Sequence, residues 1–187
     1  MKTKLYRYEG YVSGDRLPNG AVPVRFALGF GVFAEKELMV SKKTKLELGE
    51  TYVFDTKQPK GPNSKFWQAQ VITDPWSRIC KYECQVEKIY DGDTITRSVV
   101  DLGFNTTVVV KFRLYGINTP ELRGSTLAEG RIARDRLKAL ILDKAVIIKT
   151  NQDKKGKYGR YIATVYVGDL NVNRLLVDEG LAVEYLI

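Results

Sequence analysis

The segment YECQVEKIYDGDTITRSVVDLGFNTTVVVKFRLY, residues 82–115, contains three runs that are rich in Val, Ile, Thr and Tyr. Such residues favour β-strands because β-branched and aromatic side chains pack well on a pleated, half-buried surface. Asp91, Gly92 and Asp93 separate the first two runs and have the composition of a tight hairpin turn. The segment therefore predicts three consecutive strands, at Tyr82–Tyr90, Thr94–Val100 and Thr107–Tyr115.

A helix is expected after these strands. Thr126 and Glu129 have the T-x-x-E spacing of a capping box, in which two side chains close the start of a helix. Ala133 and Leu137 follow at helical spacing, so we expect a helix over about residues 126–142.

The rest of the chain predicts two more strands and a second helix. The strands are expected at Ala145–Thr150 and Tyr161–Val167, across a polar, basic loop at Asn151–Arg160. The second helix should be closed by Gly180 and carry its apolar face on Val172, Leu175 and Leu176. Five strands with interposed helices predict a β-rich α+β fold, an OB-type five-stranded barrel with helices.

The sequence predicts two domains, residues 1–80 and 81–187, and the first of them is a small all-β barrel or sandwich. Residues 1–80 carry 13 Lys and Arg against 8 Asp and Glu, whereas the rest carries 17 against 14. Aromatic side chains among the basic ones suit a surface that stacks bases, although a small β core would use the same side chains. The expected strands lie at Tyr6–Val12, Val22–Ala34, Lys45–Asp55 and Phe66–Thr73.

The composition restricts the partner and the chemistry. The chain has 30 Lys and Arg against 22 Asp and Glu, a formal charge of +8, which favours an anionic partner such as nucleic acid. It has no histidine, so histidine-based catalysis is excluded. Cys80 and Cys84 alone cannot complete a four-ligand zinc site, and we interpret them as structural thiols. Any catalysis must use carboxylates, Arg, Lys, Tyr or a metal.

The sequence also predicts a soluble, cytoplasmic protein without a membrane partner. The first residues, MKTKLYRYEGYVSGD, are polar and aromatic where a signal peptide needs an apolar run of about 7 to 15 residues. No stretch of the chain approaches the ~20 apolar residues that are needed to cross a bilayer.

Three short segments together have the composition of a site for phosphoryl chemistry. Each alone is interpreted as a loop: Asp91-Gly92-Asp93, Thr119-Pro120-Glu121 and Lys157-Tyr158-Gly159-Arg160. Phosphoryl chemistry needs hard oxygen ligands for a cation, a base for water and fixed positive charges, and each segment supplies one of these. The segments lie at the ends of successive strands, which a barrel can bring to one rim.

With these residues the chain resembles the staphylococcal nuclease (thermonuclease) family. The motifs VEKIYDGDTI, KFRLYGINTPEL and KYGRYIATVYV stand in the family's order, and LNVNRLLVDEGLA is similar to its closing helix. The resemblance covers about residues 82–187 and does not extend to residues 1–80. It implies a nuclease-like fold for the C-terminal domain.

The resemblance implies a calcium site. Asp93, Asn118 and the backbone carbonyl of Thr119 would bind the cation, and Asp91 would be a nearby outer carboxylate. The family has an aspartate where this chain has Asn118, so one negative charge is missing, although an amide oxygen can still coordinate. Magnesium or another divalent cation is therefore an alternative to calcium.

The resemblance also implies catalytic roles. Glu121 would accept a proton from, or orient, the water that attacks phosphorus. Arg113 and Arg160 would bind the phosphate, since a planar guanidinium donates paired hydrogen bonds and stays charged. Lys157 and Tyr158 would bind the substrate near its phosphate end.

These inferences predict a metal-dependent nuclease that hydrolyses phosphodiester bonds of DNA, with RNA as a further candidate substrate and little base specificity. The alternative is a nucleic-acid-binding module with weak or no activity, in which Asn118 has impaired metal binding. The N-terminal domain would either hold nucleic acid or bind a protein partner.

Overall fold

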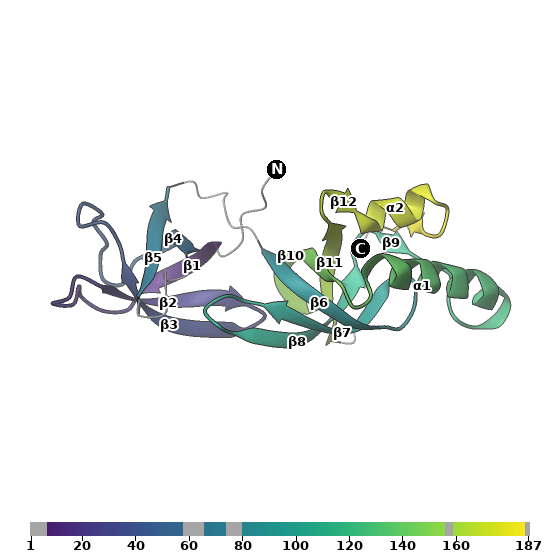
Figure 1. Ribbon diagram of the computed structural model, residues 1–187, viewed down its shortest axis with the longest axis horizontal. Coiled ribbons are helices and arrows are strands. Elements are labelled where there is room, and N and C mark those ends of the chain that lie inside the picture. The colour runs from purple at the N-terminus through teal and green to yellow at the C-terminus, as the bar shows by residue number, and fades with distance from the viewer. Residues whose placement is uncertain (1–6, 58–65, 74–79, 156–158, 186–187) are drawn as a thin grey trace. The chain divides into compact units, whose positions relative to one another are not determined.

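The computed structural model describes residues 7–57, 66–73, 80–155 and 159–185 (Figure 1), and these residues are β-rich with two α-helices. The chain divides into two compact units. The first unit contains Lys2–Ile79 and Leu102–Asn105, and the second contains Cys80–Asp101 and Thr106–Ile187. Within the described ranges, no helix has the length and apolar character needed to cross a bilayer.

The strands of the first unit close into a barrel in the order β1-β2-β3-β5-β4. The pair β3–β5 is parallel, and the other neighbours are antiparallel. The strands are β1 (Arg7–Val12), β2 (Val22–Gly29), β3 (Val32–Met39), β4 (Thr51–Lys57) and β5 (Trp67–Ile72). Alternate side chains of β2 are buried, namely Val22, Val24, Phe26 and Leu28, as expected for a strand with one face on a core.

The prediction of one continuous strand at Val22–Ala34 is wrong, because a tight turn divides it into β2 and β3. Phe30 and Gly31 adopt φ angles of 54° and 77° at this turn. Glycine takes such a positive φ without steric cost, so Gly31 permits the chain reversal. Strand-forming β-branched and aromatic residues lie on both sides of the turn, so strand propensity alone does not predict it.

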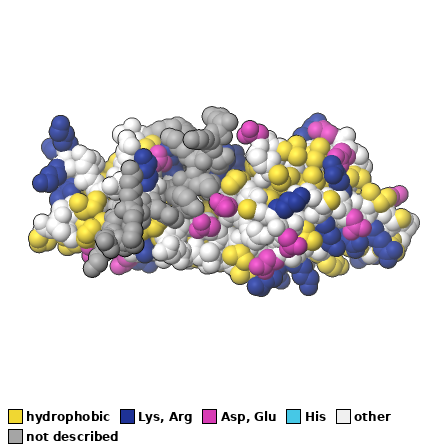
Figure 2. Space-filling view, viewed as in Figure 1, with side chains coloured by type: hydrophobic (Ala, Val, Ile, Leu, Met, Phe, Trp, Pro, Cys, Tyr) yellow, Lys and Arg dark blue, Asp and Glu magenta, His cyan; other side chains and the backbone are white. Residues whose placement is uncertain are grey.

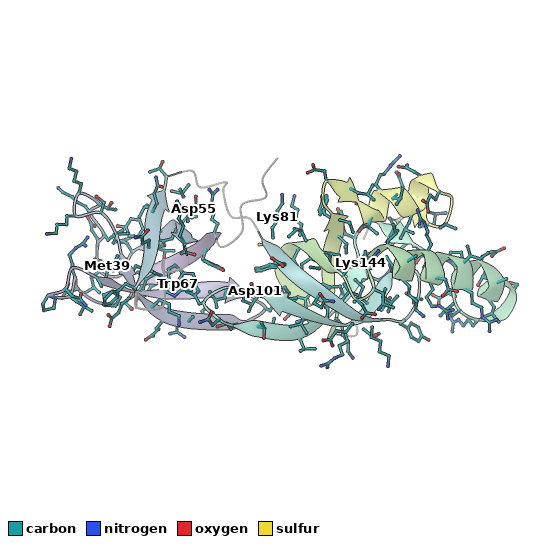
Figure 3. All side chains as sticks on the ribbon, viewed as in Figure 1. Met39, Asp55, Trp67, Lys81, Asp101 and Lys144 are labelled. Carbon is teal, nitrogen blue, oxygen red and sulfur yellow. The ribbon has the colours of Figure 1, made fainter. Side chains whose placement is uncertain are left out.

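The segment Leu102–Asn105, which joins β7 (Thr94–Asp101) to β8 (Thr107–Leu114), supplies part of the core of the first unit. Phe104 lies with its ring centroid 4.4 Å from that of Trp67, a residue labelled in Figure 3, and 5.3 Å from that of Tyr8. Tyr8 Oη donates a hydrogen bond of 2.6 Å to the carbonyl oxygen of Leu102. The first unit is therefore built from two stretches of the sequence.

The second unit contains a ring of five paired strands. β10 pairs with β6, then β7, β8 and β11 follow, and β11 pairs again with β10. Its short strands are β9 (Ile117–Asn118), β12 (Leu170–Asn171) and β13 (Val183–Glu184). The long strands are β6 (Lys81–Ile89), β7 (Thr94–Asp101), β8 (Thr107–Leu114), β10 (Ala145–Lys155) and β11 (Tyr161–Val167).

The two units repeat one order of strands. In chain order, the first strand of each ring pairs with the second and the fourth, and the third pairs with the fifth. The pair of third and fifth strands is parallel in both units, β3–β5 and β8–β11. The second unit differs by the helices that follow β8 and β11.

Helix α1 (Leu127–Ile141) packs on the second unit through buried Gly130, Ala133, Leu137 and Ile141. A short 3-10 turn at Gly124–Thr126 precedes it. The predicted capping box is wrong, because the hydroxyl of Thr126 donates backwards to the carbonyls of Glu121 and Arg123 and makes no cap hydrogen bond. At the other end, Lys144 Nζ donates to the carbonyl oxygen of Ala139 at 2.6 Å.

The two remaining elements differ in how well the sequence anticipated them. The loop expected to begin at Asn151 begins later, because β10 continues to Lys155. Helix α2 (Val172–Asp178) ends as predicted, since Gly180 has a φ of 72° and its N–H donates to the carbonyl of Val177 at 2.9 Å.

Candidate active site

The turn Asp91-Gly92-Asp93 joins β6 to β7 and packs against two other elements. Asp91 Oδ1 accepts a hydrogen bond of 3.1 Å from the backbone N–H of Asp93. A Cβ atom at Gly92 would lie 2.8 Å from Ala133 Cβ of α1 and 2.8 Å from Thr119 Cγ2. Such distances are too short for carbon atoms, so the turn can approach the helix and Thr119 only with glycine at this position.

Asp93 is buried and accepts several hydrogen bonds. Its Oδ2 accepts from the backbone N–H of Thr119 at 2.9 Å and from the Thr119 hydroxyl at 3.1 Å. Arg113 Nη1 lies 2.7 Å from the same oxygen, although its N–H direction does not meet hydrogen-bond geometry. Oδ1 accepts from the hydroxyl of Thr94 at 3.1 Å. Asp93 therefore connects β7, β8 and the segment after β9.

Burial raises the pKa of Asp93 above its ordinary value of 3.8. The hydrogen bond from the Thr119 N–H and the positive charge of Arg113 act in the opposite direction, and the nearby Asp91 raises the pKa further. A buried carboxylate that costs desolvation energy is better stabilised by a further positive charge. The site is thus suited to a cation.

Arg113 connects two predicted metal ligands. Its Nη2 donates a hydrogen bond of 2.9 Å to Asn118 Oδ1, while Nη1 lies beside Asp93. Only 11% of the Arg113 side chain is exposed, so its charge acts in a partly desolvated environment. The predicted phosphate ligand and the predicted metal ligands therefore lie within contact distance of one another.

Thr94 connects Asp93 to the second arginine. Its hydroxyl donates to Asp93 and accepts a hydrogen bond of 3.0 Å from Arg160 Nη1. Thr94 was absent from the predicted site residues, although it is the last letter of the DGDT motif. The sequence could have indicated this role, because a hydroxyl next to a buried carboxylate commonly donates a hydrogen bond to one of its oxygens.

Glu121, the predicted general base, follows Thr119 by two residues. Its side chain is exposed, and among the described residues no hydrogen bond or ion pair to its carboxylate is found. Its backbone is fixed, because a Cβ atom at Gly130 would lie 2.7 Å from the carbonyl oxygens of both Pro120 and Glu121. Gly130 thus allows α1 to pack directly against the segment that carries Glu121. The remaining predicted site residues, Lys157 and Tyr158, lie outside the described residues.

Asn173 fixes the end of β8 and was also not predicted. It is buried on α2, and its Nδ2 donates to the carbonyl oxygens of Tyr115 at 2.9 Å and Ala163 at 3.2 Å. Its Oδ1 accepts from the N–H of Val165 at 3.0 Å. Tyr115 follows Arg113 by two residues, so Asn173 holds the strand that positions the arginine.

The oxygen atoms of the site fit a hard divalent cation by their chemistry. Asp91, Asp93 and Asn118 offer carboxylate and amide oxygens, which calcium and magnesium prefer. The charge is low: within the described residues no cluster of three or more Asp, Glu, Cys or His is found. Arg113 also contacts two of the same oxygens. A cation would bind here in competition with the Arg113 guanidinium.

Proteins that carry the names thermonuclease or endonuclease are similar to about half of the chain. A thermonuclease of Staphylococcus intermedius is 34% identical over 100 residues, which is 52% of this chain and 56% of that protein. A thermonuclease of Staphylococcus hyicus is 32% identical over 101 residues, with the same shares. An uncharacterized endonuclease of Haemophilus influenzae is 33% identical over 105 residues, 56% of this chain and 53% of that protein.

The chain spans about half the length of these curated relatives. The family described as staphylococcal nuclease homologue matches residues 111–187, which contain Arg113, Asn118, Glu121 and Arg160. This match confirms the resemblance inferred from the motifs, and it leaves the first unit without a recognised family. Over residues 111–187 the chain is therefore similar to the staphylococcal nuclease homologues.

Proposed function

We propose that this protein is a metal-dependent nuclease that hydrolyses phosphodiester bonds in DNA, with RNA as a second candidate substrate. The observation that supports the proposal best is the contact of Asp93 with Arg113, Thr119 and Thr94, the last of which binds Arg160. One carboxylate thus connects residues that the family resemblance assigns to cation and phosphate. The names of the relatives, thermonuclease and endonuclease, support the same class of reaction.

Asp93, Asn118 and the carbonyl of Thr119 would hold the cation, with Asp91 nearby. When bound, a divalent cation supplies Lewis-acid polarisation of a phosphate oxygen. Calcium is the expected ion, and magnesium is the alternative because Asn118 contributes no charge. The chain's own contribution is a buried carboxylate that Thr119 and Thr94 orient through hydrogen bonds.

Arg113 and Arg160 bind the phosphate in this proposal. Charge on the phosphate oxygens changes as water attacks, and fixed guanidinium groups stabilise the transition state more than the ground state. Arg113 contacts Asn118 and Asp93, and Arg160 donates to Thr94, so both guanidinium groups lie near the proposed cation site before substrate binds. Each arginine is expected to contribute about a hundredfold in rate, by analogy with single oxyanion donors.

Glu121 accepts the proton of the attacking water in this proposal. Its exposed carboxylate can reach solvent, and its backbone is fixed beside Gly130. A general base must lie within hydrogen-bond reach of the proton that it removes, which an exposed carboxylate beside the site can satisfy when substrate is present.

A nucleic-acid-binding module without efficient cleavage is the second candidate. The observation that favours it is the pairing of Arg113 with both Asp93 and Asn118, because it neutralises a site that already lacks one family carboxylate. In either case we propose that the ring of five strands is an OB-type barrel and that the two units are the two domains. A protein partner of the first unit is the alternative to nucleic acid there.

The test is incubation of the purified protein with single-stranded and duplex DNA, in calcium, in magnesium and in chelator. The nuclease proposal expects cleavage that requires the divalent cation. DNA that is bound but stays intact at high calcium would instead favour the binding module.

A further inference from the structure

A cavity of about 870 Å³ lies in the first unit, at the side formed by β4, β5 and the loop that joins β3 to β4. Its volume is within the range of about 300 to 1,000 Å³ that is usual for ligand sites. The family resemblance does not extend to this unit. We propose that the cavity binds a short stretch of single-stranded nucleic acid, and only the identity of this polymer rests on the proposed function.

The charge of the cavity selects an anion. Among the described residues that line it, Lys45 is the only charged one, and no carboxylate is present. Polar neutral groups surround Lys45 and can donate hydrogen bonds to phosphate or base oxygens: Ser41, Thr44, Thr51, Gln70 and Thr73. A lining with one cation and several neutral donors matches a phosphate group better than a neutral or cationic ligand.

The positive charge continues beyond the cavity, which favours a polymer. Lys42 and Lys43 are exposed on the same loop as Lys45. Figure 2 shows dark blue side chains over this loop, at the end of the first unit. A mononucleotide would occupy the cavity alone, whereas successive phosphates of a strand can also contact the lysines outside it. Glu47 and Glu50 follow on the loop but do not line the cavity.

An aromatic ring in the cavity favours an unpaired base. Tyr52 lines the cavity, and its Oη accepts a hydrogen bond of 3.1 Å from the backbone N–H of Glu47. Its ring also packs edge-on against Phe54, with centroids 6.3 Å apart. A ring that is fixed in this way can stack on a base, and Val71 provides an apolar side chain on the same face of the sheet. A paired base in a duplex is not available for such stacking.

The order of strands supports the same ligand. The first unit repeats the strand order of the second, with the same parallel pair. Barrels of this topology commonly bind oligonucleotides on the face of their second and third strands and on nearby loops. The cavity lies on another side, at β4, β5 and the loop that joins β3 to β4. The strand order thus supports the class of ligand, whereas the position of the cavity rests on its own lining residues.

The test measures binding to a labelled oligothymidylate of about ten nucleotides, with the full chain carrying Glu121→Gln in chelator, so that cleavage does not interfere. Lys45→Gln should weaken binding about three- to tenfold and reduce the slope of log affinity against log salt by about 0.7. Thr51→Glu, which places a carboxylate in the cavity at an exposed position, should weaken binding at least about tenfold. Lys88→Gln, an equal loss of charge at an exposed site on β6, is the control.

The inference is overturned if Lys45→Gln and Thr51→Glu bind as the Lys88→Gln control does. The inference is also overturned if thymidine monophosphate binds the Lys45-dependent site as tightly as the oligonucleotide does. The site would then bind a free nucleotide. Lys45→Gln should weaken the binding of duplex DNA less than it weakens the binding of the single strand. The binding assay measures no cleavage, so its result does not depend on whether the protein is a nuclease.

Discussion

Arg113 Nη1 lies 2.7 Å from Oδ2 of Asp93, so a proposed phosphate ligand directly contacts a proposed metal ligand. The other terminal nitrogen of Arg113 donates to Asn118. A cation and the guanidinium would compete for these oxygens, whereas a bound phosphate would offer Arg113 a different acceptor. Cation and nucleic acid should therefore bind with positive coupling.

Arg113→Gln should change two properties in opposite directions. Cleavage should fall about a hundredfold, because a phosphate ligand is lost. Calcium affinity should rise about three- to tenfold, because a competing charge is removed from Asp93. Calorimetry and a cleavage assay measure the two effects. Arg160→Gln is the control, since Arg160 contacts Thr94, and it should lower cleavage without raising calcium affinity. A loss of calcium affinity in Arg113→Gln would contradict the competition.

Asn118→Asp should increase calcium affinity about tenfold, or about 1.4 kcal/mol, because it adds the carboxylate that the family has at this position. Isothermal titration with calcium measures the change. Asn171→Asp is a matched control, since Asn171 caps α2 and aspartate is also a good N-cap residue. Equal calcium affinities in the two variants would show that Asn118 does not coordinate the cation.

Asp93→Asn should remove cation binding and should also remove the dependence of stability on pH that Asp93 causes. Burial raises the pKa of Asp93 above 3.8, so the folded state holds this proton more tightly than the unfolded state. The wild type therefore loses stability as the pH rises from 3.8 through the raised pKa, and the variant does not.

Urea unfolding of both proteins from pH 3.8 upwards measures how the stability of each depends on pH. Asp135→Asn is the control, because a hydrogen bond from Arg134 lowers the pKa of that exposed carboxyl. A variant whose stability falls with rising pH as steeply as that of the wild type would contradict the raised pKa of Asp93.

Gly130→Ala should destabilise the protein by about 1 to 3 kcal/mol, because its Cβ would overlap the carbonyl oxygens of Pro120 and Glu121. Helix propensity alone predicts the opposite sign, a gain of about 1 kcal/mol. Thermal unfolding measures the change, and Ala139→Gly at an exposed position of α1 calibrates the propensity effect. A stabilised Gly130→Ala variant would mean that α1 does not pack closely on the Glu121 segment.

Local patterns predicted much of the fold. The hairpin at Asp91-Gly92-Asp93, α1 and the end of α2 at Gly180 follow from turn chemistry and helical periodicity, which act over a few residues. The turn at Phe30 and Gly31 was missed because strand-forming residues flank it on both sides. The capping box failed because Thr126 has closer acceptors in the preceding turn.

Contacts between distant residues could not be predicted. The packing of Phe104 with Tyr8 and Trp67 joins residues from opposite halves of the chain, and no periodic pattern in the sequence predicts this contact. Removal of residues 1–80 would therefore also remove the partners of Phe104, so such a truncation would not isolate the function of the first unit. The roles of Thr94 and Asn173 likewise depend on partners that only the fold brings near.

The most direct test of the nuclease mechanism is the single-turnover rate at which Glu121→Gln cleaves a short single-stranded DNA at saturating calcium. The mechanism predicts a rate at least about a hundredfold below that of the wild type, because the general base is lost. Glu129→Gln, an equal change at an exposed glutamate of α1, should cleave like the wild type. Wild-type cleavage by Glu121→Gln would contradict the assignment of Glu121, and with it the proposed mechanism.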